Sequence, residues 1–129
     1  MKTPTTLKYS RNHEWVKIEG TQARVGITDY AQSQLGDVVF VEVPEVDSTI
    51  VVGAGFSVVE SVKAVSDIYA PIGGMVVEVN QALTDKPEIM NEDPYGEGWL
   101  VVIEMADQGD LDELLSSEEY EKLIEEGGH

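Results

Sequence analysis

The segment 56–71 constrains the fold most, because it places two extended runs on either side of one lysine, Lys63. Residues 56–62 alternate between two faces, which is the period-two pattern of a β-strand. Turn-forming residue types follow at Ser66 and Asp67, before a second extended run that a proline closes. The segment therefore predicts a β-hairpin whose tip presents the lysine amine to solvent.

Other short runs in the chain have the same strand-like character and end at glycine or proline. Turn signals at such close spacing are typical of small all-β folds. We therefore expect a mainly β domain, a sandwich or flattened barrel of about seven short strands. The further strands are expected in six ranges, 13–19, 22–27, 37–43, 48–52, 75–79 and 99–104, and the stretch 80–98 as an ordered loop with one helical turn.

A short helix is expected between the second and third of these runs. Thr28 is a good N-cap for residues 29–35, because its hydroxyl can accept a hydrogen bond from a free backbone N–H of the first turn. Gly36 is placed to end the helix in the left-handed conformation. A helix of about two turns gains little from its own propensity, so packing must hold it.

The acidic tail, at about 110–126, has the pattern of two short helices. Asp110 with Glu113, and Ser116 with Glu119, each fit the spacing of a capping box. Apolar residues recur at helical spacing after each box, so each helix can lay one stripe on the β core while its acids face water. The second helix is expected to end at the Gly127–Gly128 pair.

Composition excludes several function classes. The 129 residues suit one domain spanning 1–129, and the formal net charge of −17 disfavours nucleic acid and anionic membrane surfaces as partners. The chain has no cysteine, so redox chemistry would need an attached group. Its two histidines, His13 and His129, lack the spacing of a zinc site, and no phosphate loop or nucleophile motif is present. An enzyme acting alone is not expected.

The run VESVKAVSDIYAPIGG around Lys63 resembles the lipoyl-attachment segment of the glycine cleavage system H proteins. The resemblance extends over nearly the whole chain, because LKYSRNHEWV, VGITDYAQSQLGDVVFVEVPEV, NEDPYGEGWLVVIE and ELLSSEEYEKLIEE match further blocks of that family in the same order. It implies a hybrid barrel-sandwich of short antiparallel strands with short helices. It also implies lipoate bound covalently to Lys63.

The resemblance implies a non-catalytic carrier subunit of a multienzyme system. Such a carrier shuttles the aminomethyl group of glycine from a pyridoxal-phosphate-dependent glycine decarboxylase to a tetrahydrofolate-dependent aminomethyltransferase. It then presents the dithiol to dihydrolipoyl dehydrogenase, and a lipoate-attaching enzyme loads it. A monomer in the cytoplasm is expected, or alternatively a mature protein of the mitochondrial matrix.

The loaded arm folds back against its own protein in this family, where a charged amine is best met by a carboxylate. By match to the family pattern, Glu14 and Asp67 are the candidate carboxylates. Asn12 lies beside them in the sequence pattern, at a position where the family carries a serine. These three residues are the expected aminomethyl-arm pocket.

The residues of the chain bear on three alternative functions. A biotin carrier shares the fold type, but its lysine normally lies between methionines, whereas Lys63 lies between Val62 and Ala64. A lipoyl domain of a 2-oxoacid dehydrogenase is shorter and continues into a linker. An H-like protein that donates or relays lipoate to other enzymes would have the same sequence features.

Overall fold

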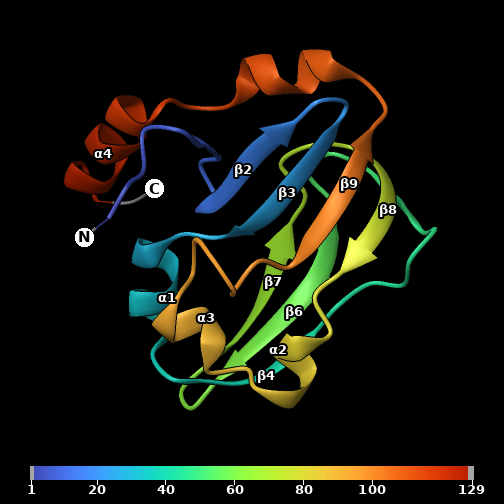
Figure 1. Cartoon of the computed structure of the whole chain (residues 1–129). Coiled ribbons are helices and arrows are strands. Elements are labelled where there is room, and N and C mark those ends of the chain that lie inside the picture. The colour runs from blue at the N-terminus through green and yellow to red at the C-terminus, as the bar shows by residue number, and fades with distance from the viewer. Residues whose placement is uncertain (1, 128–129) are drawn as a thin grey trace.

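The computed structural model describes residues 2–127, which form two antiparallel sheets with short helices around them (Figure 1). The larger sheet has six strands in the order β1-β2-β3-β9-β8-β5, and the smaller has three in the order β4-β6-β7. Neither sheet closes into a barrel. The strands are β1 (Lys8–Tyr9), β2 (Glu14–Glu19), β3 (Gln22–Ile27), β4 (Val38–Glu42), β5 (Thr49–Ile50), β6 (Gly55–Ser61), β7 (Val65–Tyr69), β8 (Gly74–Val79) and β9 (Val101–Met105).

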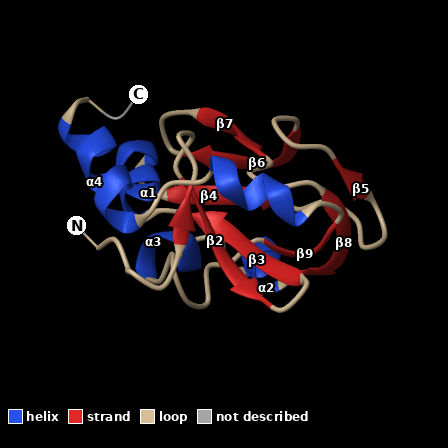
Figure 2. Cartoon of the chain, turned by 90° about the horizontal axis from the view of Figure 1, so that it is seen from above, coloured by secondary structure: helices blue, strands red, loops and turns tan. Residues whose placement is uncertain are grey.

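The mainly β fold with short helices is therefore confirmed. The helices are α1 (Asp29–Leu35), α2 (Ala82–Asp85), α3 (Ile89–Glu92), the 3-10 helix η1 (Gln108–Glu113) and α4 (Ser117–Glu125). Seen from above, α1 and α4 lie together at one end of the molecule, and β5 lies at the other (Figure 2). No helix within residues 2–127 has the length and apolar character needed to cross a membrane.

The first predicted hairpin is confirmed as the pair β2 and β3. Trp15 of β2 lies opposite Gly26 of β3, and the indole is almost fully buried. A Cβ atom on residue 26 would lie only 2.7 Å from three atoms of the indole ring. A glycine is therefore required here for the tryptophan to pack flat on the neighbouring strand.

The second predicted hairpin is confirmed as β6 and β7, but its turn lies earlier than the turn-forming residue types indicated. Ser66 and Asp67 are paired with Val59 and Val58 of β6, so both belong to the strand. The chain reverses between Ser61 and Ala64, where the Ser61 N–H donates to the Ala64 carbonyl across 2.8 Å. Strand pairing thus overrides the local turn preference of Ser66 and Asp67, because it satisfies their backbone groups better.

The helix α1 confirms the positions of both predicted caps, although the ψ of −160° at Gly36 lies outside the left-handed helical region that was expected. Thr28 Oγ1 accepts a hydrogen bond of 3.1 Å from the Ala31 N–H, and Gly36 ends the helix with a φ of 80°, a value that favours glycine. The stretch 80–98 contains α2 and α3, which is one more helix than expected. The predicted strand over 48–52 is confirmed only for the two residues of β5.

The tail confirms one capping box and contradicts the other. Ser116 and Glu119 form both hydrogen bonds of the box at the start of α4. Asp110 lies inside η1, whose N-cap is Asp107, and its carboxylate accepts from the Gly73 N–H at 3.0 Å. The carboxylate of Asp110 therefore holds a loop of the sheet, and the predicted helix is a short 3-10 helix. Of the predicted closing pair of glycines, Gly128 lies outside the described residues.

Two apolar clusters hold these elements together. The larger lies between the two sheets and includes residues of β3, β4, β6, β8 and β9. The smaller attaches α4 to the first strands and consists of Leu7, Tyr9, Trp15, Leu115, Tyr120 and Leu123. Because Tyr9 and Tyr120 stack with ring centroids 4.7 Å apart, α4 is fixed against the end of the sheet beside α1.

Candidate functional site

Lys63 lies in the turn between β6 and β7, at the bottom of the view in Figure 1, and its side chain is exposed. The strands on either side belong to the smaller sheet, so the turn sits on a rigid base. The aliphatic stem of Lys63 lies over Gly36, because a Cβ atom on residue 36 would be 3.5 Å from Lys63 Cε. The lysine therefore rests on the C-terminal end of α1 while its amine remains accessible.

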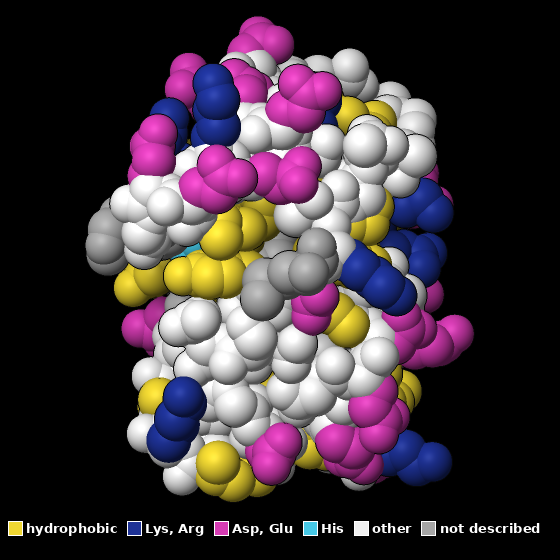
Figure 3. Space-filling model, turned by 90° about the vertical axis from the view of Figure 1, so that its left-hand side faces the viewer, with side chains coloured by type: hydrophobic (Ala, Val, Ile, Leu, Met, Phe, Trp, Pro, Cys, Tyr) yellow, Lys and Arg dark blue, Asp and Glu magenta, His cyan; other side chains and the backbone are white. Residues whose placement is uncertain are grey.

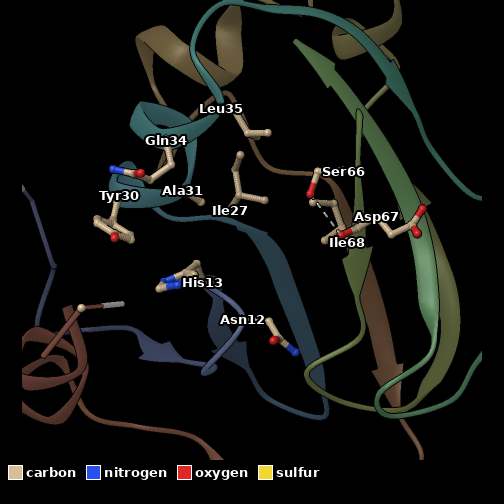
Figure 4. Close-up of a pocket in the computed structure, with 11 residues that line it drawn as sticks. Asn12, His13, Ile27, Tyr30, Ala31, Gln34, Leu35, Ser66, Asp67 and Ile68 are labelled. Atoms are coloured by element: carbon tan, nitrogen blue, oxygen red, sulfur yellow. Dashed lines mark hydrogen bonds between the residues drawn. The ribbon is translucent and has the colours of Figure 1, made fainter. Parts of the chain in front are cut away.

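A hollow of about 390 Å³ opens between α1 and β7, next to this turn (Figure 4). Its floor and one wall are apolar, through Ile27, Ala31, Leu35 and Ile68. Leu35 directly precedes Gly36, so the hollow begins beside the point where the Lys63 stem rests. The remaining lining residues are polar, aromatic or glycine: Asn12, His13, Tyr30, Gln34, Ser66, Asp67 and Gly127.

The structure brings two of the three expected arm-pocket residues to this hollow. Asn12 and Asp67 both line it, whereas Glu14 is not among its described lining residues. In Figure 4 the Asp67 carboxylate points away from the group formed by Ile27, Leu35 and His13. Sequence reasoning missed Ser66, whose side chain lies on the side of β7 that faces this group (Figure 4).

Glu14 is buried, with only 2% of its surface exposed, and it is paired in the sheet with Ile27, which lines the hollow. Its carboxylate accepts a hydrogen bond of 2.5 Å from the Ser10 hydroxyl. Burial raises the pKa of Glu14 to about 7, because the charged form loses its hydration, while hydrogen bonds from Ser10 and the Tyr69 backbone oppose the shift. Glu14 can therefore change its charge near neutral pH.

His13 and Tyr120 form a second polar group at the hollow that sequence reasoning also missed. His13 Nδ1 lies 2.8 Å from the Tyr120 hydroxyl, which lies 2.7 Å from Thr28 Oγ1. His13 has a φ of 69°, an uncommon value for a residue with a side chain. The group joins α4 to the N-cap of α1 and to the hollow. Sequence reasoning missed it because His13 and Tyr120 are 107 positions apart, and a single sequence carries no signal that they pair.

Acidic side chains gather in the upper part of the surface on the α1 and α4 side of the molecule, with several Lys and Arg side chains on the same face (Figure 3). Hydrophobic side chains form a band across the middle of the same face (Figure 3). No group of three or more metal-ligating side chains occurs among residues 2–127. The described site thus offers an accessible amine, an apolar hollow and carboxylates.

These features are typical of a class of protein, small β-fold carriers that present an accessible lysine in the turn of a β-hairpin. A search of known families finds that the family described as Glycine cleavage H-protein matches residues 7–127. The chain therefore belongs to the glycine cleavage H-protein family, and its role as a lipoyl carrier in glycine cleavage is confirmed at the level of the family.

Individual relatives agree with this assignment. The glycine cleavage system H protein of Carboxydothermus hydrogenoformans is 56% identical over 125 residues, which cover 97% of this chain and 96% of the relative. The H protein of Halothermothrix orenii is 54% identical over 126 residues, 98% of each chain. The crystal structure of an H protein from Mycobacterium marinum matches with a TM-score of 0.85 and 41% identity, covering 96% of this chain and 98% of that one.

Proposed function

We propose that Lys63 carries lipoate in amide linkage and that the chain is a non-catalytic carrier subunit of the glycine cleavage system. The observation that supports this most directly is the exposed Lys63, whose stem rests on Gly36 at the edge of the hollow. An aliphatic arm attached there would find apolar side chains within the hollow at Ile27, Ala31 and Leu35. The residues present therefore fit the group.

Bound lipoate supplies a redox-active sulfur pair that a chain without cysteine lacks. The chain itself would contribute an apolar surface for the arm and acidic side chains for its amine. The apolar side chains of the hollow would limit the contact of a bound arm with water, and Asn12 offers a side-chain acceptor there. Asp67 also lines the hollow, and its carboxylate would have to turn inward to reach the arm. Glu14 gains negative charge as it ionises near neutral pH, so it would attract a cationic amine held in the hollow.

The partners that follow are the pyridoxal-phosphate-dependent decarboxylase, the aminomethyltransferase, dihydrolipoyl dehydrogenase and a lipoate-attaching enzyme. Each must reach the Lys63 turn, and its exposure at one end of the smaller sheet allows this. We further propose that residues 1–129 act as one monomeric lipoyl-carrier domain in the cytoplasm. The bacterial origin of the similar proteins supports that location.

Attachment at Lys63 is tested with purified lipoate ligase, ATP and lipoic acid, followed by the intact mass and the mass of the peptide that spans residue 63. Wild-type protein should gain one lipoyl group and the Lys63→Arg variant none. Lys17→Arg is the matched control, because Lys17 is an exposed lysine on β2 and its loss should leave the mass gain unchanged. Labelling of the Lys63→Arg variant at the wild-type level would contradict the proposal.

The mass of the same peptide tests the biotin-carrier alternative, and an activity assay tests the lipoate-relay alternative. A biotin ligase should leave the mass unchanged, since the flanks of Lys63 lack the methionines that biotin carriers have. Glycine decarboxylation assayed with the decarboxylase, the aminomethyltransferase and dihydrolipoyl dehydrogenase separates a carrier from a relay of lipoate, because a relay would support lipoate transfer without turnover of glycine.

A further inference from the structure

The Ser61 side chain organises the turn that presents Lys63. Its hydroxyl oxygen accepts hydrogen bonds from the backbone N–H of Lys63 at 3.3 Å and of Ala64 at 3.1 Å. The same hydroxyl lies 3.3 Å from the Ala64 carbonyl, to which it donates. One buried side chain thus satisfies three backbone groups at the apex of the hairpin.

Two further contacts hold the apex against the segment that follows α1. The Val62 N–H donates to the Asp37 carbonyl at 3.0 Å, which ties the turn to the chain just before β4. The Lys63 stem rests on the neighbouring residue, Gly36, as described above. Ser61 holds the backbone of the turn, and Gly36 supports the stem of the lysine. Together these contacts fix the direction in which the Lys63 side chain projects from the protein.

We propose that Ser61 is a positioning residue for the attachment of lipoate to Lys63, so that the attaching enzyme binds a preformed turn. This inference rests on the proposed function, which makes Lys63 the modified residue. An enzyme that binds a flexible turn must spend binding free energy to order it, whereas a preformed turn removes that cost. The Ser61 hydroxyl should therefore matter for enzyme recognition and leave the chemical reactivity of the amine unchanged.

A second serine of β6 provides a matched control. Ser57 lies on the same buried face of β6 as Ser61, and its hydroxyl donates to the Glu42 carbonyl of β4. Replacing either serine by alanine removes a buried hydroxyl with its hydrogen bond, but only Ser61 reaches the turn. A difference between the two variants thus isolates the effect of the turn from a general loss of stability.

The experiment measures lipoylation by purified ligase at varied concentrations of the carrier. Ser61→Ala should lower kcat/KM by about three- to tenfold, mainly through a higher KM, because a hydrogen bond of ordinary net strength is lost. Ser57→Ala should stay at the wild-type value, and Ser61→Thr should recover most of the loss because it keeps the hydroxyl. Acylation of Lys63 by a small amine-reactive reagent should proceed at the same rate in all of these proteins.

Amide hydrogen exchange of the unmodified wild type tests the turn without any variant. The Lys63 and Ala64 amides should exchange much more slowly than those of an open loop. Unprotected exchange at both amides would overturn the inference, as would wild-type kcat/KM in Ser61→Ala or an equal loss in Ser57→Ala. Absence of lipoylation at Lys63 in the wild type would instead contradict the proposed function, so the two failures are distinguishable.

Discussion

The Ser10 hydroxyl donates a hydrogen bond of 2.5 Å to the Glu14 carboxylate inside the protein, where both residues are at least nine-tenths buried. The Glu14 N–H in turn donates to Ser10 Oγ at 3.1 Å. These two bonds and one from the Tyr69 backbone do not offset the loss of hydration, so the pKa of Glu14 is raised from 4.5 to about 7. A carboxyl group with this pKa links stability to pH.

The first prediction concerns that linkage. Because the pKa is higher in the folded protein than in the unfolded chain, the contribution of Glu14 to stability is fully present below pH 4.5 and is lost as the pH rises through 7. The shift corresponds to about 3 kcal/mol of unfolding free energy, most of it lost between these two values. Urea unfolding of wild type and Glu14→Gln over this range should show the wild-type advantage shrinking as pH rises. A constant difference would contradict the burial of an ionisable group here.

The second prediction concerns the proposed cargo. Glu14→Ala should leave lipoylation of Lys63 intact but speed the loss of the aminomethyl group from the loaded carrier by about tenfold, as expected for a lost charged hydrogen bond. Mass spectrometry of the loaded carrier over time measures both. Glu118→Ala is the control, because it removes a carboxylate from the exposed face of α4. Equal decay in Glu14→Ala and wild type would remove Glu14 from this role and leave Asp67 and Asn12.

The strands were largely predictable because alternation and the closing glycines and prolines are local signals. Where the prediction was wrong, pairing with another segment of the chain decides the structure, and the local pattern of residue types does not show that pairing. Ser66 and Asp67 join β7 because β6 offers them backbone partners, and β1, which was not predicted, has only two residues and exists through its pairing with β2. Asp110 caps no helix because its carboxylate bonds to Gly73, 37 positions away.

The site was predictable only in part, for the same reason. The exposed position of Lys63 follows from the two runs that flank it. The burial of Glu14 does not follow, since an acid on an alternating strand is usually exposed. The contact of Tyr120 with Thr28 and His13 depends on where α4 packs, and the helical spacing of its apolar residues does not specify that position.

The third prediction tests that contact. Tyr120→Phe keeps the ring that stacks on Tyr9 but removes the hydroxyl bonded to Thr28 and His13, so it should lower the free energy of unfolding by about 1–3 kcal/mol. Tyr30→Phe is the control, because the Tyr30 hydroxyl has no hydrogen bond to another described residue and its removal should cost less than about 0.5 kcal/mol. Equal melting temperatures for the two variants would show that the hydroxyl of Tyr120 does not stabilise the packing of α4.

The fourth prediction concerns the packing of Trp15 on Gly26. In Gly26→Ala the new methyl group would overlap the indole at 2.7 Å, and the ring is buried with its N–H bonded to the Pro94 carbonyl at 2.9 Å, so it has no space to move. The variant should lose about 3 kcal/mol of unfolding free energy and show altered tryptophan fluorescence. Gly55→Ala is the matched control, since nothing lies within 4 Å of a Cβ atom there, and it should remain near wild type. A Gly26→Ala protein with unchanged stability would mean that the indole does not lie flat against β3.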